Sequence, residues 1–68
     1  MSVQLVKTVK FLIPDDGDRN FSWWAEYEWH SQNQIWFCRG NNSGFMEKYN
    51  FPWQMTDQEM TFYMVKYG

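Results

Sequence analysis

The chain has very little cysteine, with Cys38 as the single one among its 68 residues. One cysteine cannot form a disulfide within the chain, which agrees with a reducing compartment. A structural zinc site needs four ligands, usually Cys and His, and the sequence offers only Cys38 and His30. We therefore expect no disulfide, no zinc site and no cofactor.

Long apolar runs and an excess of positive charge are also missing. The longest apolar runs, such as 11–13 and 62–65, span three or four residues, whereas a transmembrane helix needs about 20. Residues 1–4 show no secretory signal pattern, so we expect a cytoplasmic protein with no membrane contact. Six Lys and Arg stand against eight Asp and Glu, so binding of nucleic acid through its phosphates is not expected.

Aromatic residues are what the chain has in abundance. Five Trp, six Phe and four Tyr make up 22% of the sequence. A domain this short buries only about 60% of the surface of its unfolded chain, and each aromatic side chain can bury about 150 to 250 Å². A few rings can therefore fill the core, and the surplus is expected at the surface, where exposed apolar area often marks a contact site.

Three segments alternate apolar and polar residues with the period of a β-strand. These segments are residues 3–13, 21–30 and 34–39. The first two are separated by the turn formers of residues 14–20, and the last two by a loop at residues 31–33. Residues 45–51 predict a short fourth strand, which Pro52 ends.

The register of each hairpin decides which side chains lie on the core face of the sheet. A three-residue loop at 31–33 pairs apolar with apolar residues on one face only. Its pairs are Trp29 with Ile35, Tyr27 with Phe37, Glu28 with Trp36 and Glu26 with Cys38. A two-residue loop would place Glu28 against Phe37 and His30 against Ile35, so we prefer the longer loop. The matching register of the first hairpin pairs Ile13 with Phe21, Phe11 with Trp23 and Val9 with Ala25.

The segment 57–67 has two interpretations. As a helix, it is capped by Thr56, Glu59 completes a Thr-x-x-Glu capping box, and Met55 and Met60 form a hydrophobic staple. As a strand, it is supported by its β propensity. The start signals favour the helix, whose apolar stripe is Met60, Tyr63, Met64 and Tyr67. The predicted fold is α+β: an antiparallel three- to four-stranded meander with one C-terminal helix packed on one face, in a single domain.

Three polar groupings admit a chemical reading, and each has a plainer one. Residues 16–20 begin like a calcium loop but lack its later Gly and Glu, so we interpret them as a hairpin turn. Cys38 and His30 fall on one face about 13 Å apart, too far for proton transfer. Glu26 and Glu28 lie about 7 Å apart, but a glycosidase needs a deep cleft. We expect no catalytic residue.

The feature that points to function is the face of the sheet opposite the predicted core, here called the outer face. Trp24 and Trp36 are expected there among polar residues, surrounded by Lys10, Glu26 and Glu28. Trp is enriched at the energetic centres of protein interfaces. Lys10 is expected across from Trp24, as a cation over the ring. The alternative is that a helix or a second sheet covers both indoles.

We therefore expect a small non-enzymatic protein-binding module, by analogy of size and composition an inhibitor or modulator that a virus or mobile element directs at a larger host protein in the cytoplasm. The alternative is an aromatic platform on which single-stranded nucleic acid or carbohydrate stacks. A protein partner is the first expectation, and a homodimer formed through the same face is the second.

Overall fold

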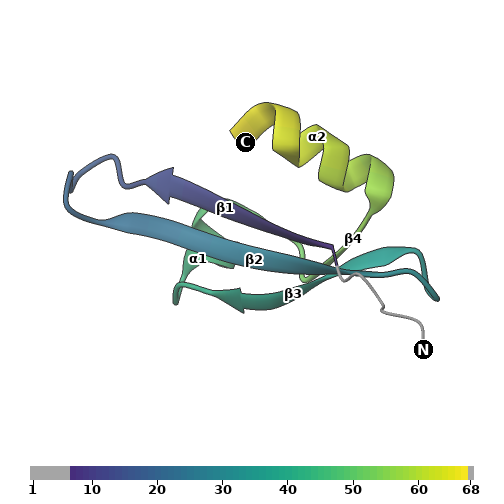
Figure 1. Ribbon diagram of the computed structural model, residues 1–68. Helices are drawn as coiled ribbons and strands as arrows, with labels where there is room; N and C mark the ends of the chain where they lie inside the picture. Colours follow the sequence, from purple (N-terminus) through teal and green to yellow (C-terminus); the bar gives the residue numbers. More distant parts are fainter. Residues whose placement is uncertain (1–6, 68) are drawn as a thin grey trace.

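The computed structural model describes residues 7–67, which form one curled antiparallel sheet and two helices (Figure 1). The strands are β1 (Thr8–Pro14), β2 (Ser22–His30), β3 (Ile35–Asn41) and β4 (Gln54–Thr56), paired in the order β1-β2-β3-β4. The helices are α1 (Phe45–Lys48), between β3 and β4, and α2 (Asp57–Tyr67), directly after β4. The predicted α+β meander with a C-terminal helix is confirmed. The part of the first strand predicted at residues 3–6 lies outside the described residues.

The β1–β2 hairpin keeps the predicted faces but pairs two residues further along the chain. Phe11 lies opposite Ala25 rather than opposite the predicted Trp23. The ladder continues into the turn, because the Asp15 N–H donates to the Phe21 carbonyl at 3.0 Å. Since side chains alternate with a period of two, a shift of two residues leaves each of them on its predicted face.

The predicted register of the β2–β3 hairpin is wrong by one residue. The loop spans residues 31–34, with Gln34 at a φ of 51°, and Trp29 lies opposite Trp36 instead of Ile35. The observed pairs include Glu28 with Phe37 and His30 with Ile35, the register that we had disfavoured. A one-residue change turns the strand over, which places Trp36 on the core side. The physical reason is that the two indoles pack together, with ring centroids 5.2 Å apart.

A β-bulge interrupts the same ladder. Tyr27 lies opposite Cys38 but Glu26 lies opposite Gly40, so Arg39 is the extra residue. The bulge brings Gly40 beneath Trp24, where an added Cβ would lie 3.2 Å from a carbon of the indole ring. A residue without a side chain therefore leaves room for Trp24 to lie across the strand.

The prediction of a strand at residues 45–51 is wrong. A single helical turn, α1, occupies the start of this segment, after Gly44 at a φ of 87° and before Asn50 at a φ of 57°. Two left-handed residues let the chain turn sharply at both ends of α1. The resulting compact loop brings Phe45 and Phe51 into the core, with ring centroids 4.6 Å apart. The fourth strand of the sheet is the later β4.

The prediction of a helix after Thr56 is confirmed, together with its capping box. The Glu59 N–H donates to Thr56 Oγ1 at 3.2 Å, and the Thr56 N–H donates to Glu59 Oε1 at 3.1 Å. Met55 and Met60 are both buried in the core. The predicted stripe is wrong at Met64, which is 45% exposed, because α2 turns only its Met60 side fully toward the sheet.

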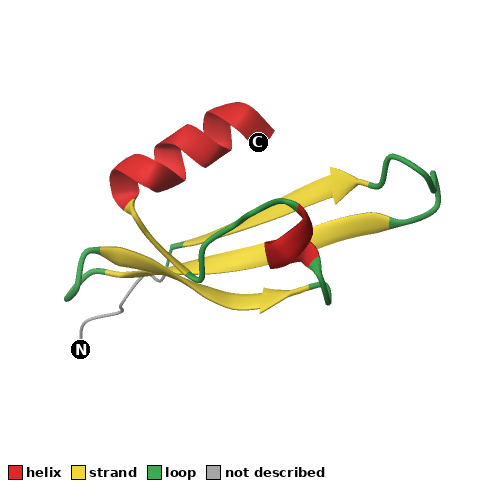
Figure 2. Ribbon diagram, turned by 180° about the vertical axis from the view of Figure 1, so that it is seen from behind, coloured by secondary structure: helices red, strands yellow, loops and turns green. Residues whose placement is uncertain are grey.

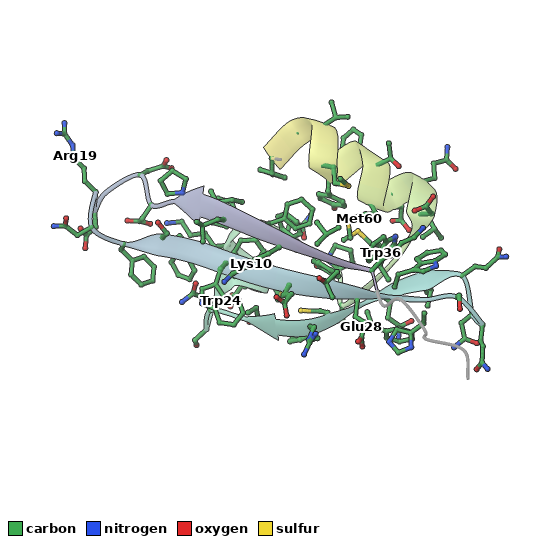
Figure 3. All side chains as sticks on the ribbon, viewed as in Figure 1. Lys10, Arg19, Trp24, Glu28, Trp36 and Met60 are labelled. Carbon is green, nitrogen blue, oxygen red and sulfur yellow. The ribbon has the colours of Figure 1, made fainter. Side chains whose placement is uncertain are left out.

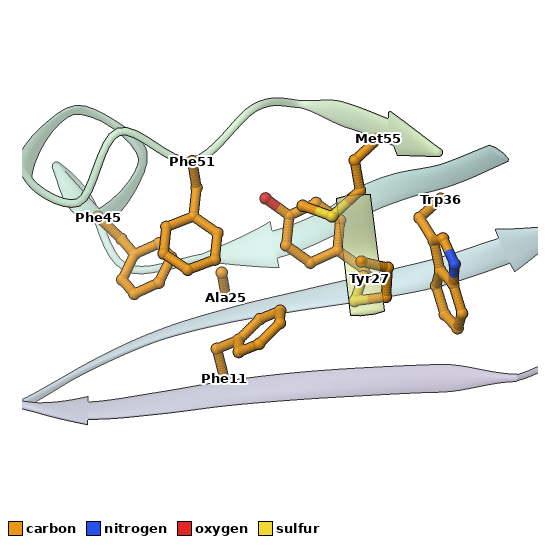
Figure 4. Close-up of a cluster of buried hydrophobic side chains, with 8 residues drawn as sticks. Phe11, Ala25, Tyr27, Trp36, Phe45, Phe51 and Met55 are labelled. Atoms are coloured by element: carbon orange, nitrogen blue, oxygen red, sulfur yellow. The ribbon is translucent and has the colours of Figure 1, made fainter. Parts of the chain in front are cut away.

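The core lies on one face of the sheet (Figure 4), and both helices contribute a buried side chain to it. Its buried members are Phe11, Ala25, Tyr27, Trp36, Phe45, Phe51, Met55 and Met60. They come from β1, β2, β3, β4, α1, α2 and the segment after α1, so every element contributes. Figure 2 shows α1 and the segment that follows it in front of the sheet. Among the described elements, none covers the outer face, which faces the viewer in Figure 1.

Candidate functional site

The outer face is the surface on which the structure places most of the predicted contact residues (Figure 3). Lys10, Trp24, Glu26 and Glu28 lie on it, on the neighbouring strands β1 and β2. Trp36 does not, since it belongs to the core. The structure therefore brings four of the five predicted residues together and removes the fifth.

Trp24 forms the centre of the outer face. Its ring is half-buried against Gly40, and the Nζ of Lys10 lies 5.2 Å from its ring centroid. Lys10 reaches the indole from the neighbouring pair, because its direct partner is Glu26. Leu12 is the residue directly opposite Trp24, and its side chain is 61% exposed. The exposed Leu12 and the neighbouring indole of Trp24, which packs against Gly40, give the face an apolar centre.

Charged side chains surround this centre. Arg39 Nε lies 3.1 Å from Glu26 Oε1, and His30 Nε2 lies 3.3 Å from Glu28 Oε2, a contact that is an ion pair only when His30 is protonated. The His30 ring also packs against Phe37, with centroids 4.7 Å apart. Surface ion pairs contribute only about 0 to 1 kcal/mol each. Together with Lys10, they place charges of both signs around the apolar centre of the face.

Trp36 cannot serve as a surface anchor, so its predicted role is wrong. Its side chain is 5% exposed, and its Nε1–H donates to Asp57 Oδ1 at 3.2 Å. Met55 lies directly opposite it on β4. The indole therefore ties β3 to the start of α2. Alternation along β3 could not reveal this, because the facing of the strand depends on the hairpin register.

The predicted placement of Cys38 and His30 on one face is also wrong. Cys38 lies opposite Tyr27 instead of Glu26, with its Sγ 4.0 Å from the Met46 Sδ, on the core side. His30 lies on the outer face. The register change that moves Trp36 moves Cys38 with it, so this thiol has no imidazole beside it to act as a base.

Asp15 is the carboxylate with the strongest local interactions. Its Oδ1 accepts hydrogen bonds from Lys48 Nζ at 2.7 Å and from Trp23 Nε1 at 2.8 Å, while its Oδ2 accepts one from the Gly17 N–H. The bond from Lys48, and after it the bond from Trp23, lowers the pKa of Asp15 to about 2. The same bond raises the pKa of Lys48. These contacts fasten the β1–β2 turn to α1, which is a structural role.

Sequence reasoning missed several exposed apolar side chains. Trp53 is 62% exposed between α1 and β4, and Phe62 and Val65 lie three residues apart on α2, turned away from the core. The helical spacing of Phe62 and Val65 relative to Met60 was a signal that could have placed them on the outward side of the helix. Nothing in the local pattern marks Trp53.

Within residues 7–67, no three His, Cys, Asp or Glu side chains gather where they could hold a metal ion. In the same part of the chain, no helix has the length and apolar character needed to cross a membrane. Comparisons with protein-family models, with curated proteins and with solved structures find no match for this chain.

Proposed function

We propose that this protein is a non-enzymatic protein-binding module that docks on a larger protein through its outer face. The observation that carries the proposal is the pairing of Leu12 with Trp24 on a sheet face that none of the described helices covers. The leucine is 61% exposed, and the neighbouring indole packs against Gly40. Charged residues of both signs border the pair. An apolar centre with a polar rim is the ordinary anatomy of a protein interface.

The position of Trp24 in the sheet also supports this role. Trp24 lies on β2, a central strand of the sheet, rather than on a loop, so little entropy is lost when a partner covers it. A domain of this size acts by covering part of its partner, which makes inhibition or modulation of a larger protein the expected consequence.

The experiment places an acidic residue at the centre of the face without disturbing the core. Leu12→Glu changes an exposed side chain, and Val65→Glu, at a position 84% exposed on α2, is the matched control. Wild type and both variants are immobilised and the proteins retained from a cell extract are quantified. We expect at least one protein retained equally by wild type and Val65→Glu but lost with Leu12→Glu, because a buried unpaired carboxylate is costly.

The opposite pattern would reject the proposal. If Val65→Glu loses the retained protein and Leu12→Glu keeps it, the docking surface is α2. Light scattering measures the oligomeric state of the purified protein. If wild type is a dimer and Leu12→Glu is a monomer, the partner is a second copy of this chain. Circular dichroism of both variants tests whether the loss comes from unfolding.

A further inference from the structure

A shallow depression lies on the helix-covered side of the molecule, away from the outer face. It has a volume of about 480 Å³ and opens to solvent between the end of β3, the helical turn α1 and the segment that leads to β4. Its side chains include Asn41, Ser43, Met46, Glu47, Phe51 and Trp53. This volume falls in the range of about 300 to 1,000 Å³ typical of sites for small molecules.

Trp53 is the prominent side chain of this depression. Its backbone is fixed, since its carbonyl accepts a hydrogen bond from the Cys38 N–H at 2.9 Å, yet its side chain is 62% exposed. The indole N–H groups of Trp23 and Trp36 donate to carboxylates, whereas that of Trp53 donates to no group in the described chain. An anchored residue with an open ring and a free donor can receive a ligand without reorganisation of the backbone.

The remaining groups restrict the chemistry of such a ligand. Ser43 offers a hydroxyl and Glu47 a carboxylate, and Asn41 adds an amide whose Nδ2 also donates to Cys38 Sγ at 3.6 Å. Together these groups can donate to and accept from hydroxyl groups. None of the residues that line the depression within the described chain is Lys or Arg, and Glu47 repels negative charge. A phosphate or a carboxylate is therefore a poor fit, and a neutral ligand rich in hydroxyls is a good one.

We propose that this depression binds a neutral pyranose sugar as part of an oligosaccharide. A pyranose ring has one face covered mainly by C–H groups, which lies against the flat indole of Trp53, and a rim of hydroxyls, which meets Asn41, Ser43 and Glu47. The site differs from the docking face in position and in residues. It also differs from the platform expected from the sequence, which consisted of exposed aromatic rings on the sheet.

The test is a titration of ¹⁵N-labelled protein with maltotetraose, cellotetraose and chitotetraose, followed by two-dimensional NMR. We expect at least one of these sugars to shift the Trp53 indole N–H and the backbone signals of Asn41 and Ser43 in a saturable way. Trp53→Ala should weaken that binding by about tenfold or more, and its missing indole signal assigns the resonance. Phe62→Ala, at another exposed aromatic position, is the matched control and should leave the affinity unchanged.

A second titration tests whether the site prefers neutral over acidic sugars. An acidic chain, tetragalacturonate, should bind more weakly than the neutral sugars, and Glu47→Gln should reduce that difference. The proposal is overturned if none of the three neutral sugars shifts these signals at millimolar concentration, or if Phe62→Ala weakens binding as much as Trp53→Ala. It is also overturned if the shifts fall on Leu12 and Trp24 instead, since the sugar would then occupy the outer face.

Discussion

Replacing Tyr27 with Phe removes one oxygen atom from the centre of the core. The side chain of Tyr27 is fully buried, and its hydroxyl donates to the Pro52 carbonyl at 2.6 Å. Burial raises the pKa of this phenol above its usual value, so it remains a protonated donor. The bond joins β2 to the segment before β4, which are 25 positions apart in the sequence. Phe keeps the ring and opens almost no cavity, so the variant removes only the contacts of the hydroxyl: the bond to Pro52 and a much longer contact, 4.0 Å, with Met46 Sδ.

The size of the destabilisation follows from the Pro52 carbonyl, which loses its hydrogen-bond donor in the variant. Within the described residues, the Pro52 carbonyl accepts no other hydrogen bond, and stranding a half-buried acceptor costs about 1 to 3 kcal/mol. We expect Tyr27→Phe to lower the free energy of unfolding by about 1.5 kcal/mol. For a domain of this size, that lowers the melting temperature by about 6 to 12 °C.

Tyr49→Phe is the matched control, and its expected effect on stability differs from that of Tyr27→Phe. Its hydroxyl is also buried, but it has no hydrogen-bond partner among the described residues. Tyr49→Phe should therefore leave stability unchanged or raise it by up to about 1 kcal/mol, because an unpaired buried hydroxyl is costly. Both variants are measured by urea unfolding followed by tryptophan fluorescence, with the slope against urea expected to stay constant.

Two results would refute this reasoning. If Tyr27→Phe is as stable as wild type, the hydroxyl of Tyr27 makes no net contribution and the segment before β4 is held by packing alone. If Tyr49→Phe is destabilised as much as Tyr27→Phe, the loss comes from removing any tyrosine hydroxyl near the core, and the bond to Pro52 has no special role.

Two further predictions concern the turn and the indoles. The pKa of Asp15 is about 2 in the folded protein and 3.8 for an ordinary Asp, so its contribution to stability is present above about pH 4 and is lost as the pH falls toward 2. In melting curves between pH 2 and pH 6, Asp15→Asn should be less stable than wild type at pH 6, and the difference should shrink toward pH 2; a constant difference would contradict this. Trp36→Ala should cost about 3 to 5 kcal/mol, comparable with the about 3 to 10 kcal/mol expected for the whole domain, whereas Trp24→Ala should cost about 1 to 2 kcal/mol. Circular dichroism during urea unfolding measures both, and equal losses would mean that the two indoles are equally buried.

The parts of the fold that sequence predicted well depend on neighbours in the chain. The alternation in residues 21–30 marks a strand wherever it pairs, and the signals at Thr56 and Glu59 define a helix start by contacts three residues apart. The four outer-face residues on β1 and β2 were placed correctly for a related reason. The error in the first hairpin was two residues, which the period of a strand conceals.

The parts that only the tertiary structure decided depend on contacts between distant segments. Residues 45–51 alternate like a strand, yet Phe45 and Phe51 are better buried when α1 folds them over β2. The backbone around Trp53 is fixed by two hydrogen bonds to distant residues, from the Cys38 N–H to the Trp53 carbonyl and from the Tyr27 hydroxyl to the Pro52 carbonyl. In that position the ring of Trp53 is exposed. The sequence could not show either result, since both follow from where other elements pack.

The amino-acid sequence by itself determined the α+β class, the turn rich in aspartate, the capped C-terminal helix and the absence of any internal disulfide. Tertiary structure decided which face of β3 is buried, and with it the fates of Trp36 and Cys38. Across a hairpin, neighbouring registers differ by one residue and both pair the backbone well. The choice between them came from Trp29, Met55 and Asp57, which hold Trp36 on the core side, and those contacts exist only once the chain has folded.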